Sequence, residues 1–170
     1  ILIANAGTHI FSKPEQFDAE EYLGLINLNY GGMLRCIEAV LPFMLQRGAG
    51  RIVGVSSLAG YRGVPRAAAY GASKSAVINF LESLRFHLAR RKIGVTIVNP
   101  GFVRTPLTDK NDFHMPFLIE ADRAAKIMCV GIARGKDEIA FPIPFSWIIK
   151  AMRIIPYPIY KMIMSRAVKY

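Results

Sequence analysis

Two side chains four residues apart, Tyr70 and Lys74, carry the clearest chemical signal in this sequence. The apolar spacing around them is typical of a helix, and positions i and i+4 share a helix face, so the amine would lie near the phenol. A nearby cation favours the phenolate, so we expect Lys74 to lower the pKa of Tyr70 from about 10. Ser57, thirteen residues before Tyr70, would hold a substrate oxygen by hydrogen bonding. Together these residues predict a site for proton transfer to or from an oxygen.

The elements that would position these residues alternate between strands and helices. Apolar runs bounded by turn residues predict strands over residues 1–4, 51–56, 95–99 and 138–141. Apolar residues at every third or fourth position predict helices over residues 19–25, 28–46, 69–90 and 121–133. This alternation predicts an α/β fold with a doubly wound, Rossmann-like parallel sheet, covered by helices on both faces.

Residues that are far apart in the sequence would meet at one edge of this sheet. Asn5, Ser57 and Pro100 each stand at the end of a predicted strand. An open parallel sheet binds its ligands at the carboxyl ends of its strands. We therefore expect one shared site there, bordered by the irregular segment 100–117.

The order of the motifs resembles that of the short-chain dehydrogenase/reductase family over residues 1–142. The resemblance rests on Ala4-Asn5-Ala6-Gly7, Asn29-Tyr-Gly-Gly32, Ser57, Tyr70-x-x-x-Lys74 and Pro100-Gly-Phe-Val-Arg-Thr105. It implies hydride transfer between a nicotinamide cofactor, NAD or NADP, and an alcohol or ketone. The family's glycine-rich turn does not precede Ile1, so we expect the sheet to be incomplete at its N-terminal half, with the first cofactor-binding part missing.

The resemblance assigns a role to each matched residue. Asn29, Ser57, Tyr70 and Lys74 would be the catalytic residues, with Tyr70 as general acid or base and Asn29 holding a water that links Lys74 to solvent. Lys74 would also bind the nicotinamide ribose. The expected cofactor contacts are Asn5, Ala6, Gly7, Tyr70, Lys74, Pro100, Gly101, Val103 and Thr105. No metal-ligand spacing is present, and no metal is expected.

Two of these assignments have competitors nearby in the sequence. Ser56 competes with Ser57, although the distance to Tyr70 along the chain favours Ser57. Asn27 competes with Asn29, but only Asn29 is followed by glycine three residues later.

Other positions allow more than one interpretation. Thr105 could cap a helix, bind the cofactor, or do both. His9, His87 and His114 form no evident cluster, and His114 is a candidate for the substrate cleft. Six largely apolar residues would border that cleft and favour an apolar alcohol or ketone, namely Leu58, Ala59, Tyr61, Phe102, Leu107 and Phe113.

The 170 residues suit one domain, which divides into a catalytic part, 1–142, and a basic apolar extension, 143–170. Five of the ten excess positive charges fall within residues 139–170, which contain no acidic residue and many aromatic and aliphatic ones. That mixture favours peripheral contact with a membrane, or else packing over the cleft or at a subunit contact. Its prolines argue against a spanning helix, and no nucleic-acid motif accompanies the charge.

Two alternatives to an active enzyme remain at this point: a non-catalytic cofactor-binding protein, and a peripheral membrane protein of the same fold. The sequence has neither a long apolar run nor a charged leader, so we expect a cytoplasmic protein, either free or membrane-associated through residues 143–170. The resemblance also implies a homo-oligomer, with the long helices after Asn29 and around Tyr70 at the contact.

Overall fold

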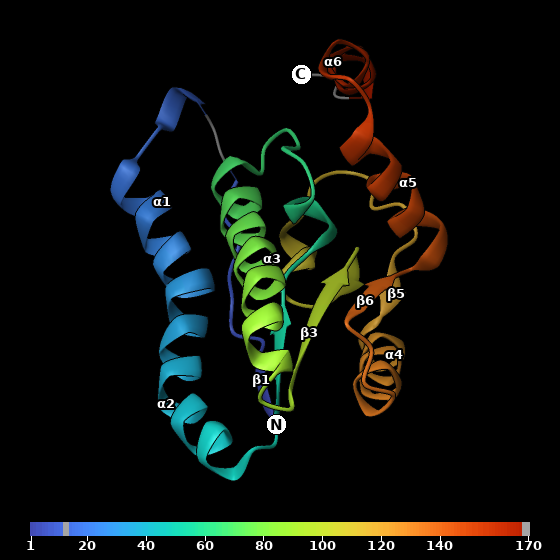
Figure 1. Cartoon of the computed structure of the whole chain (residues 1–170). Helices are drawn as coiled ribbons and strands as arrows, with labels where there is room; N and C mark the ends of the chain where they lie inside the picture. The colour runs from blue at the N-terminus through green and yellow to red at the C-terminus, as the bar shows by residue number, and fades with distance from the viewer. Residues whose placement is uncertain (12–13, 168–170) are drawn as a thin grey trace.

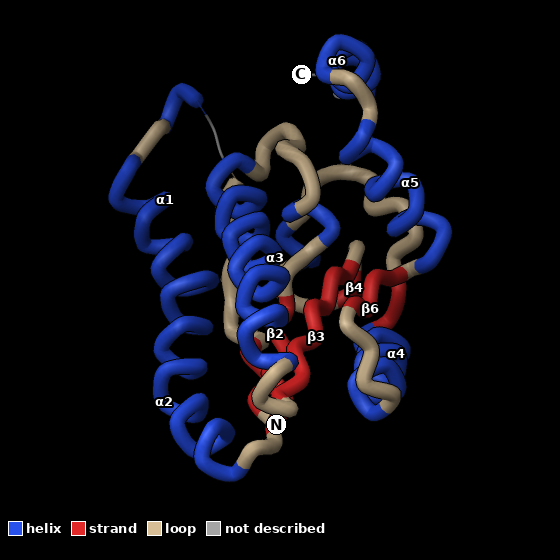
Figure 2. The backbone as a smooth tube through the Cα atoms, viewed as in Figure 1, coloured by secondary structure: helices blue, strands red, loops and turns tan. Residues whose placement is uncertain are grey.

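The computed structural model of the protein describes residues 1–11 and 14–167. In this part of the chain, four parallel strands lie in the order β1-β2-β3-β6, drawn in red at the centre of Figure 2. Their bounds are Leu2–Ala4 (β1), Gly50–Val55 (β2), Ile93–Pro100 (β3) and Glu138–Phe141 (β6). β1 forms one edge of the sheet, where Ile1 and Ile3 are 75% and 51% exposed.

Helices cover both faces of this sheet. Their bounds are Ala19–Ile26 (α1), Gly32–Arg47 (α2), Ala68–Ala89 (α3) and Ala121–Ala133 (α4). Figure 1 shows α1, α2 and α3 together on one side of the strands and α4 on the other. The predicted α/β architecture with a parallel sheet is therefore confirmed.

Neighbouring strand residues contribute to separate cores because successive side chains point to opposite faces. Ile52 belongs to the core under α2 and α3, whereas Val53 belongs to the core under α4. A methyl group added at Gly54 would lie 2.3 Å from Leu81 Cδ1, so glycine at this position lets α3 pack directly on β2. This close packing sets the distance between α3 and the sheet. It therefore also positions Tyr70 and Lys74, which lie on α3.

Strand β3 begins two residues before the predicted boundary at Val95. Gly94, just before the predicted strand, pairs with Arg51 inside the sheet. A methyl group at Gly94 would lie 2.8 Å from Arg51 Cζ, so the absent side chain makes room for the guanidinium. This glycine therefore serves a packing contact between β2 and β3.

The first two predicted helices form one continuous helical segment. Asp18 caps α1, since its Oδ1 accepts hydrogen bonds from the backbone N–H groups of Glu20 at 2.9 Å and Glu21 at 3.3 Å. The predicted break near residue 26 is instead a π-helical turn, Asn27–Gly31, that joins α1 to α2. Single π-turns inside helices are frequent at functional sites, and this one contains Asn29.

The extension beyond β6 forms two further helices, α5 (Ile143–Ile154) and α6 (Tyr157–Ala167). Prolines mark the boundaries of both helices, because Pro156 lies between them and Pro144 and Pro158 lie in their first turns. Figure 1 shows α5 running away from the end of β6 toward α6 at the edge of the molecule. Among the helices of the described residues, none has both the length and the apolar character to cross a membrane.

Candidate active site

Tyr70 and Lys74 lie in the first two turns of α3, next to the carboxyl end of β2. The Lys74 side chain is buried, with 5% of its surface exposed, and its Nζ donates a hydrogen bond to the Val55 carbonyl at 3.0 Å. Nζ lies 5.7 Å from the centroid of the Tyr70 ring. The predicted amine and phenol thus lie close together, and the last residue of β2 holds the amine.

Ser57 follows β2 and begins the short helical turn Leu58–Gly60. Its side chain hydrogen-bonds with the Tyr70 phenol, and its Oγ accepts the Ala59 backbone N–H at 3.2 Å. Ser56 is directed elsewhere, because its buried Oγ donates to the Lys74 carbonyl at 2.8 Å. Ser57 is therefore the serine of this pair that contacts the phenol.

The electrostatics of the pair differ from the expectation. Burial raises the pKa of Tyr70, and the hydrogen bond with Ser57 offsets this only in part. Burial also lowers the pKa of Lys74 to about 8. The pKa of Tyr70 is therefore raised and not lowered as expected, because desolvation of the phenolate outweighs the hydrogen bond with Ser57.

Asn29 is buried at 3% exposure, and protein groups use both N–H groups of its amide. Nδ2 donates to the Thr8 carbonyl and to Ser73 Oγ, each at 2.9 Å, and Oδ1 accepts the Thr8 backbone N–H at 2.8 Å. Its competitor Asn27 instead accepts a hydrogen bond from exposed Arg35 at 3.1 Å. The Asn29 side chain therefore connects the loop after β1 to α3, and no N–H remains in it to bind a water.

Two glycines let separate segments meet at Lys74. A methyl group at Gly60 would lie 2.8 Å from the backbone carbon of Lys74, so the loop carrying Ser57 rests directly on α3. A methyl group at Gly7 would lie 3.3 Å from Lys74 Nζ and 3.1 Å from Asn29 Oδ1. The absence of side chains at these two positions brings β1, β2 and α3 together around the amine.

The ends of β1 and β3 provide the rim on which a nicotinamide group could lie. Asn5, Ala6 and Gly7 are exposed beyond β1. An ammonium group has three N–H groups, and in the described part of the chain the hydrogen-bond acceptor of Lys74 is the Val55 carbonyl. This donor capacity beside the open backbone at Gly7 fits a ribose hydroxyl, so the residues present are compatible with a dinucleotide.

The segment after β3 brings the other predicted cofactor contacts to the same edge. Pro100 ends β3, Gly101 follows it, and Val103 lies in the two-residue strand β4 (Val103–Arg104), which pairs with β5 (Ile119–Glu120). The Thr105 carbonyl accepts the backbone N–H of Thr108 at 2.9 Å and so closes a turn. The next helical turn, Thr108–Lys110, has Leu107 at its N-cap position. Thr105 therefore does not cap this turn.

Residues 1–115 match the sequence family described as short chain dehydrogenase. The chain belongs to the short-chain dehydrogenase family. An uncharacterized oxidoreductase of Myxococcus xanthus is 40% identical over 94% of this chain and 63% of its own length. The 11-beta-hydroxysteroid dehydrogenase-like 4A of Arabidopsis thaliana is 37% identical over 86% of this chain and 50% of its own length. The chain thus spans about half to two thirds of these relatives.

Solved structures of short-chain dehydrogenases resemble this fold. A short-chain dehydrogenase from Burkholderia cenocepacia, in complex with NADP, has a TM-score of 0.82 and 24% identity, with 98% of this chain and 70% of that one covered. The enzyme from Sphingobium yanoikuyae, in complex with NADPH, has a TM-score of 0.75 and 29% identity, with 81% and 55% covered. The likeness places the short-chain dehydrogenase fold on nearly the whole chain.

No pattern in the sequence indicates that His9 contacts Tyr70. Its ring meets the Tyr70 ring edge-on, with the centroids 5.0 Å apart, and the Phe11 ring at 4.7 Å. Residue 9 lies in an irregular loop, where neither periodicity nor spacing indicates its neighbours. His114, the histidine that the sequence favoured for the cleft, is an exposed residue of the loop after β4.

Tyr61 also differs from its expected position at the cleft. Its hydroxyl donates to Glu138 Oε1 and accepts a hydrogen bond from Asn99 Nδ2 at 2.9 Å. Burial raises the pKa of Glu138, but hydrogen bonds from Lys150 and Tyr61 outweigh it and leave the pKa below its ordinary value. Tyr61 therefore belongs to a polar cluster that joins the Ser57 loop to β6 and α5.

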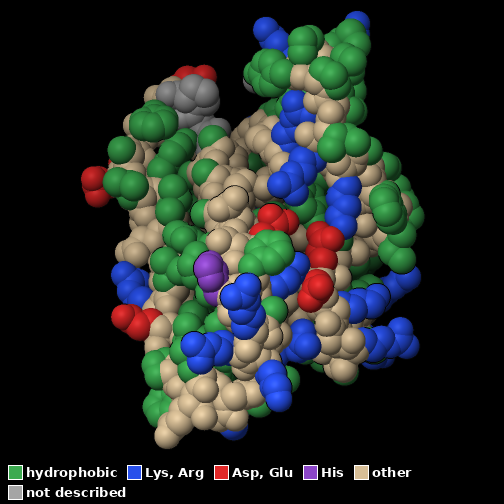
Figure 3. All heavy atoms as spheres, viewed as in Figure 1, with side chains coloured by type: hydrophobic (Ala, Val, Ile, Leu, Met, Phe, Trp, Pro, Cys, Tyr) green, Lys and Arg blue, Asp and Glu red, His purple; other side chains and the backbone are tan. Residues whose placement is uncertain are grey.

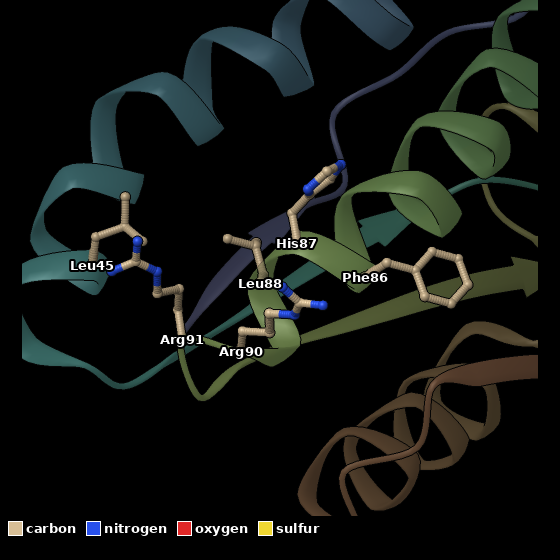
Figure 4. A pocket seen from close by; sticks show the side chains of 6 residues that line it. All are labelled: Leu45, Phe86, His87, Leu88, Arg90 and Arg91. Atoms are coloured by element: carbon tan, nitrogen blue, oxygen red, sulfur yellow. The ribbon is translucent and has the colours of Figure 1, made fainter.

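A hollow of about 560 Å³ lies at the opposite end of α3, between that helix and α2 (Figure 4). Leu45, Phe86, His87, Leu88, Arg90 and Arg91 line it. His87 stands seventeen residues after Tyr70 on the same helix, which corresponds to about 25 Å at ~1.5 Å per residue. The hollow is therefore separate from the proton-transfer pair.

Proposed function

We propose that the chain is the catalytic part of an NAD(P)-dependent oxidoreductase that transfers hydride between a nicotinamide cofactor and an alcohol or ketone. The observation that carries the proposal is the position of the Tyr70 ring, whose centroid lies 5.7 Å from the buried Lys74 amine, with Ser57 beside the phenol. When bound, the nicotinamide would supply or accept the hydride, and the protein would supply position and protons.

In the reducing direction, each side chain has a separate role. Tyr70 donates its phenolic proton to the carbonyl oxygen, and the Ser57 hydroxyl donates a hydrogen bond to the same oxygen. Lys74, when charged, stabilises the phenolate that remains. Asn29 acts by holding the Thr8 loop and α3 in place around Lys74. Oxidation of an alcohol would use the same residues in reverse.

The cofactor would lie against the exposed residues Asn5, Ala6 and Gly7 and the segment from Pro100 to Thr105. NADP is supported by the two structural neighbours that contain NADPH and NADP, and NAD remains the alternative. Lys74 would bind the ribose through an N–H group that the Val55 carbonyl does not use.

An apolar substrate is supported by a group of aromatic rings at the same edge of the sheet. Phe102 contacts Phe113 and Phe145 with centroids 5.8 and 5.9 Å apart, and Phe117 stacks on Phe145 at 5.8 Å. The relative named as 11-beta-hydroxysteroid dehydrogenase-like agrees with an apolar alcohol or ketone. We further propose a homo-oligomer formed through α2 and α3, where Phe43 and Phe86 are 70% and 76% exposed.

The test is the substitution Tyr70→Phe in the intact protein, assayed with NADPH or NADH and a panel of apolar ketones. Loss of the general acid would lower kcat on the order of 10² to 10⁴. Unchanged kcat would contradict the role of Tyr70. Cofactor binding by the same variant, followed by nucleotide fluorescence, separates a lost proton donor from a lost cofactor site.

A further inference from the structure

The outward face of α5 carries large apolar side chains. Ile143, Trp147 and Ile154 are 67%, 68% and 83% exposed. They follow one another at intervals of four and seven residues, which places them on one side of the helix. A surface helix usually turns such an apolar stripe toward the protein core, so this orientation requires another explanation.

A neighbouring side of α5 attaches to the protein through polar groups, and the Lys150 amine lies 5.9 Å from the Trp147 ring centroid at the border with the apolar stripe. Ser146 is buried at 4% exposure, and Lys150 Nζ lies 2.5 Å from Glu138 Oε2. The Arg153 guanidinium lies 5.9 Å from the Tyr61 ring centroid. These polar contacts hold the helix with its apolar stripe facing outward.

Helix α6 continues this surface and adds positive charge. Its exposed apolar residues include Ile159 and Met162, at 46% and 48% exposure, and exposed Lys161 and Arg166 lie among them. Figure 3 shows hydrophobic and basic side chains side by side on α6 at the upper end of the molecule. The sequence has no acidic residue from position 139 to position 170.

We propose that these two helices bind the surface of an anionic lipid bilayer. The α5–α6 surface consists of Ile143, Trp147, Ile148, Ile154, Tyr157, Ile159, Met162 and Ile163, with Lys161 and Arg166 among them. Exposed apolar side chains that alternate with cations suit the boundary between headgroups and acyl chains. Anionic headgroups complement the positive charge, whereas a second copy of this chain would place the same uncompensated charge against it.

The α5–α6 surface is joined firmly to the loop between Ser57 and Tyr70. Arg62 Nη1 donates to the carbonyls of Met152 and Ile155, the latter at 2.7 Å, and its guanidinium lies 3.9 Å from the Tyr160 ring centroid. The Tyr160 hydroxyl donates to the Gly63 carbonyl. A bilayer that holds α5 and α6 would therefore hold this loop at a fixed orientation. If the proposed function is correct, an apolar substrate dissolved in the bilayer would be near the site.

Charge reversal tests the electrostatic part of the proposal. The intact protein is sedimented with vesicles of phosphatidylcholine alone and with vesicles that also contain phosphatidylglycerol. We expect binding to the second type only, weakened by salt and reduced about tenfold or more by Lys161→Glu with Arg166→Glu. Arg90→Glu with Arg91→Glu, two exposed residues at the far end of α3, changes the net charge equally and should leave binding within about twofold. An equal loss of vesicle binding in both double variants would show that binding depends on net charge and not on the α5–α6 surface.

Removal of the apolar stripe tests the insertion part. Trp147→Ser with Ile154→Ser should lower vesicle binding about tenfold or more, because exposed apolar side chains would no longer enter the headgroup region. Phe17→Ser with Leu23→Ser is the matched control, since Phe17 and Leu23 are 68% and 57% exposed and lie outside the α5–α6 surface and the proposed oligomer contact. Circular dichroism checks that each variant is folded. If the wild type binds neither vesicle type, and Trp147→Ser with Ile154→Ser dissociates an oligomer, the proposal is wrong. The α5–α6 surface would then be a contact between copies of the chain.

Discussion

Asn29 donates a hydrogen bond to the Ser73 hydroxyl at 2.9 Å and thereby joins the π-helical turn to α3 one residue before Lys74. The Ser73 hydroxyl in turn donates a hydrogen bond to the Tyr70 carbonyl at 2.7 Å. Tyr70 and Lys74, the two side chains of α3 that we propose to be catalytic, are therefore flanked by a buried polar chain that begins in the loop after β1.

This chain of hydrogen bonds predicts unequal effects on stability. Asn29→Ala leaves the Thr8 backbone groups and Ser73 without their partner, so we expect the free energy of unfolding to fall by about 2–3 kcal/mol. Ser73→Ala removes one hydroxyl and should cost about 1 kcal/mol. Urea denaturation measures both. A larger loss for Ser73→Ala than for Asn29→Ala would contradict the central position of Asn29.

Lys74→Met should stabilise the fold while it abolishes turnover. The pKa of Lys74 falls from 10.5 to about 8 on burial, which corresponds to a penalty of about 3 kcal/mol for the charged form. The unfolded state holds the proton more tightly, so the penalty is complete below pH 8 and disappears as the pH rises from about 8 to 10.5. Loss of the bond to the Val55 carbonyl reduces the net gain.

Denaturation of the wild type and Lys74→Met across this pH range checks the sign. The wild type should gain stability relative to Lys74→Met between pH 8 and pH 10.5. A difference between the two proteins that does not vary with pH would show that the amine has an ordinary pKa in the folded state.

Ser57→Ala and Ser56→Ala should separate chemistry from structure. Ser57 contacts the phenol, so its loss should lower kcat on the order of 10²-fold with little change in stability. Ser56 is 2% exposed and bonds to the Lys74 carbonyl, so its loss should cost about 1–2 kcal/mol of unfolding free energy. Steady-state kinetics and thermal unfolding of both variants decide between these assignments. The reverse pattern would make Ser56 the working hydroxyl.

Gly60→Ala should move the Ser57 loop away from α3. The added methyl group meets the Lys74 backbone at 2.8 Å and cannot be relieved by rotation of a side chain. We expect a loss of about 1–3 kcal/mol in stability together with lower kcat. Gly63→Ala is the control in the same loop, because a methyl group there meets no atom within 4 Å. Similar behaviour of the two variants would refute the close contact at Gly60.

The ring of His9 should restrict the orientation of the Tyr70 ring. His9→Ala removes the edge-on contact at 5.0 Å, and we expect kcat/KM to fall about tenfold. His9→Phe keeps an aromatic ring and should restore most of that loss. If His9→Phe is as impaired as His9→Ala, the imidazole itself rather than its shape is needed, and the pH dependence of kcat/KM would then differ between the wild type and His9→Phe.

The parts of the site that the sequence predicts are those set by local pattern. Helical periodicity places Tyr70 and Lys74 on one face, and the end of an apolar strand places Ser57 beside them. The contact of His9 with Tyr70 and the bond from Tyr61 to Glu138 join segments far apart in the chain, and no local pattern encodes them. The direction of the Tyr70 pKa was missed for a related reason, because it depends on how deeply tertiary packing buries the phenol.

Three consecutive loop residues, Tyr61, Arg62 and Gly63, each hold a different part of the C-terminal region: Glu138, the end of α5, and Tyr160 of α6. A functional chimera between relatives must keep these three contacts. A chimera that receives foreign residues from Glu138 onward but keeps its own loop would lose the carbonyl partners of Arg62 and leave the half-buried Tyr61 hydroxyl without the Glu138 carboxylate. The loop at residues 61–63 and the C-terminal region should therefore be exchanged together, although a long stretch of chain separates them.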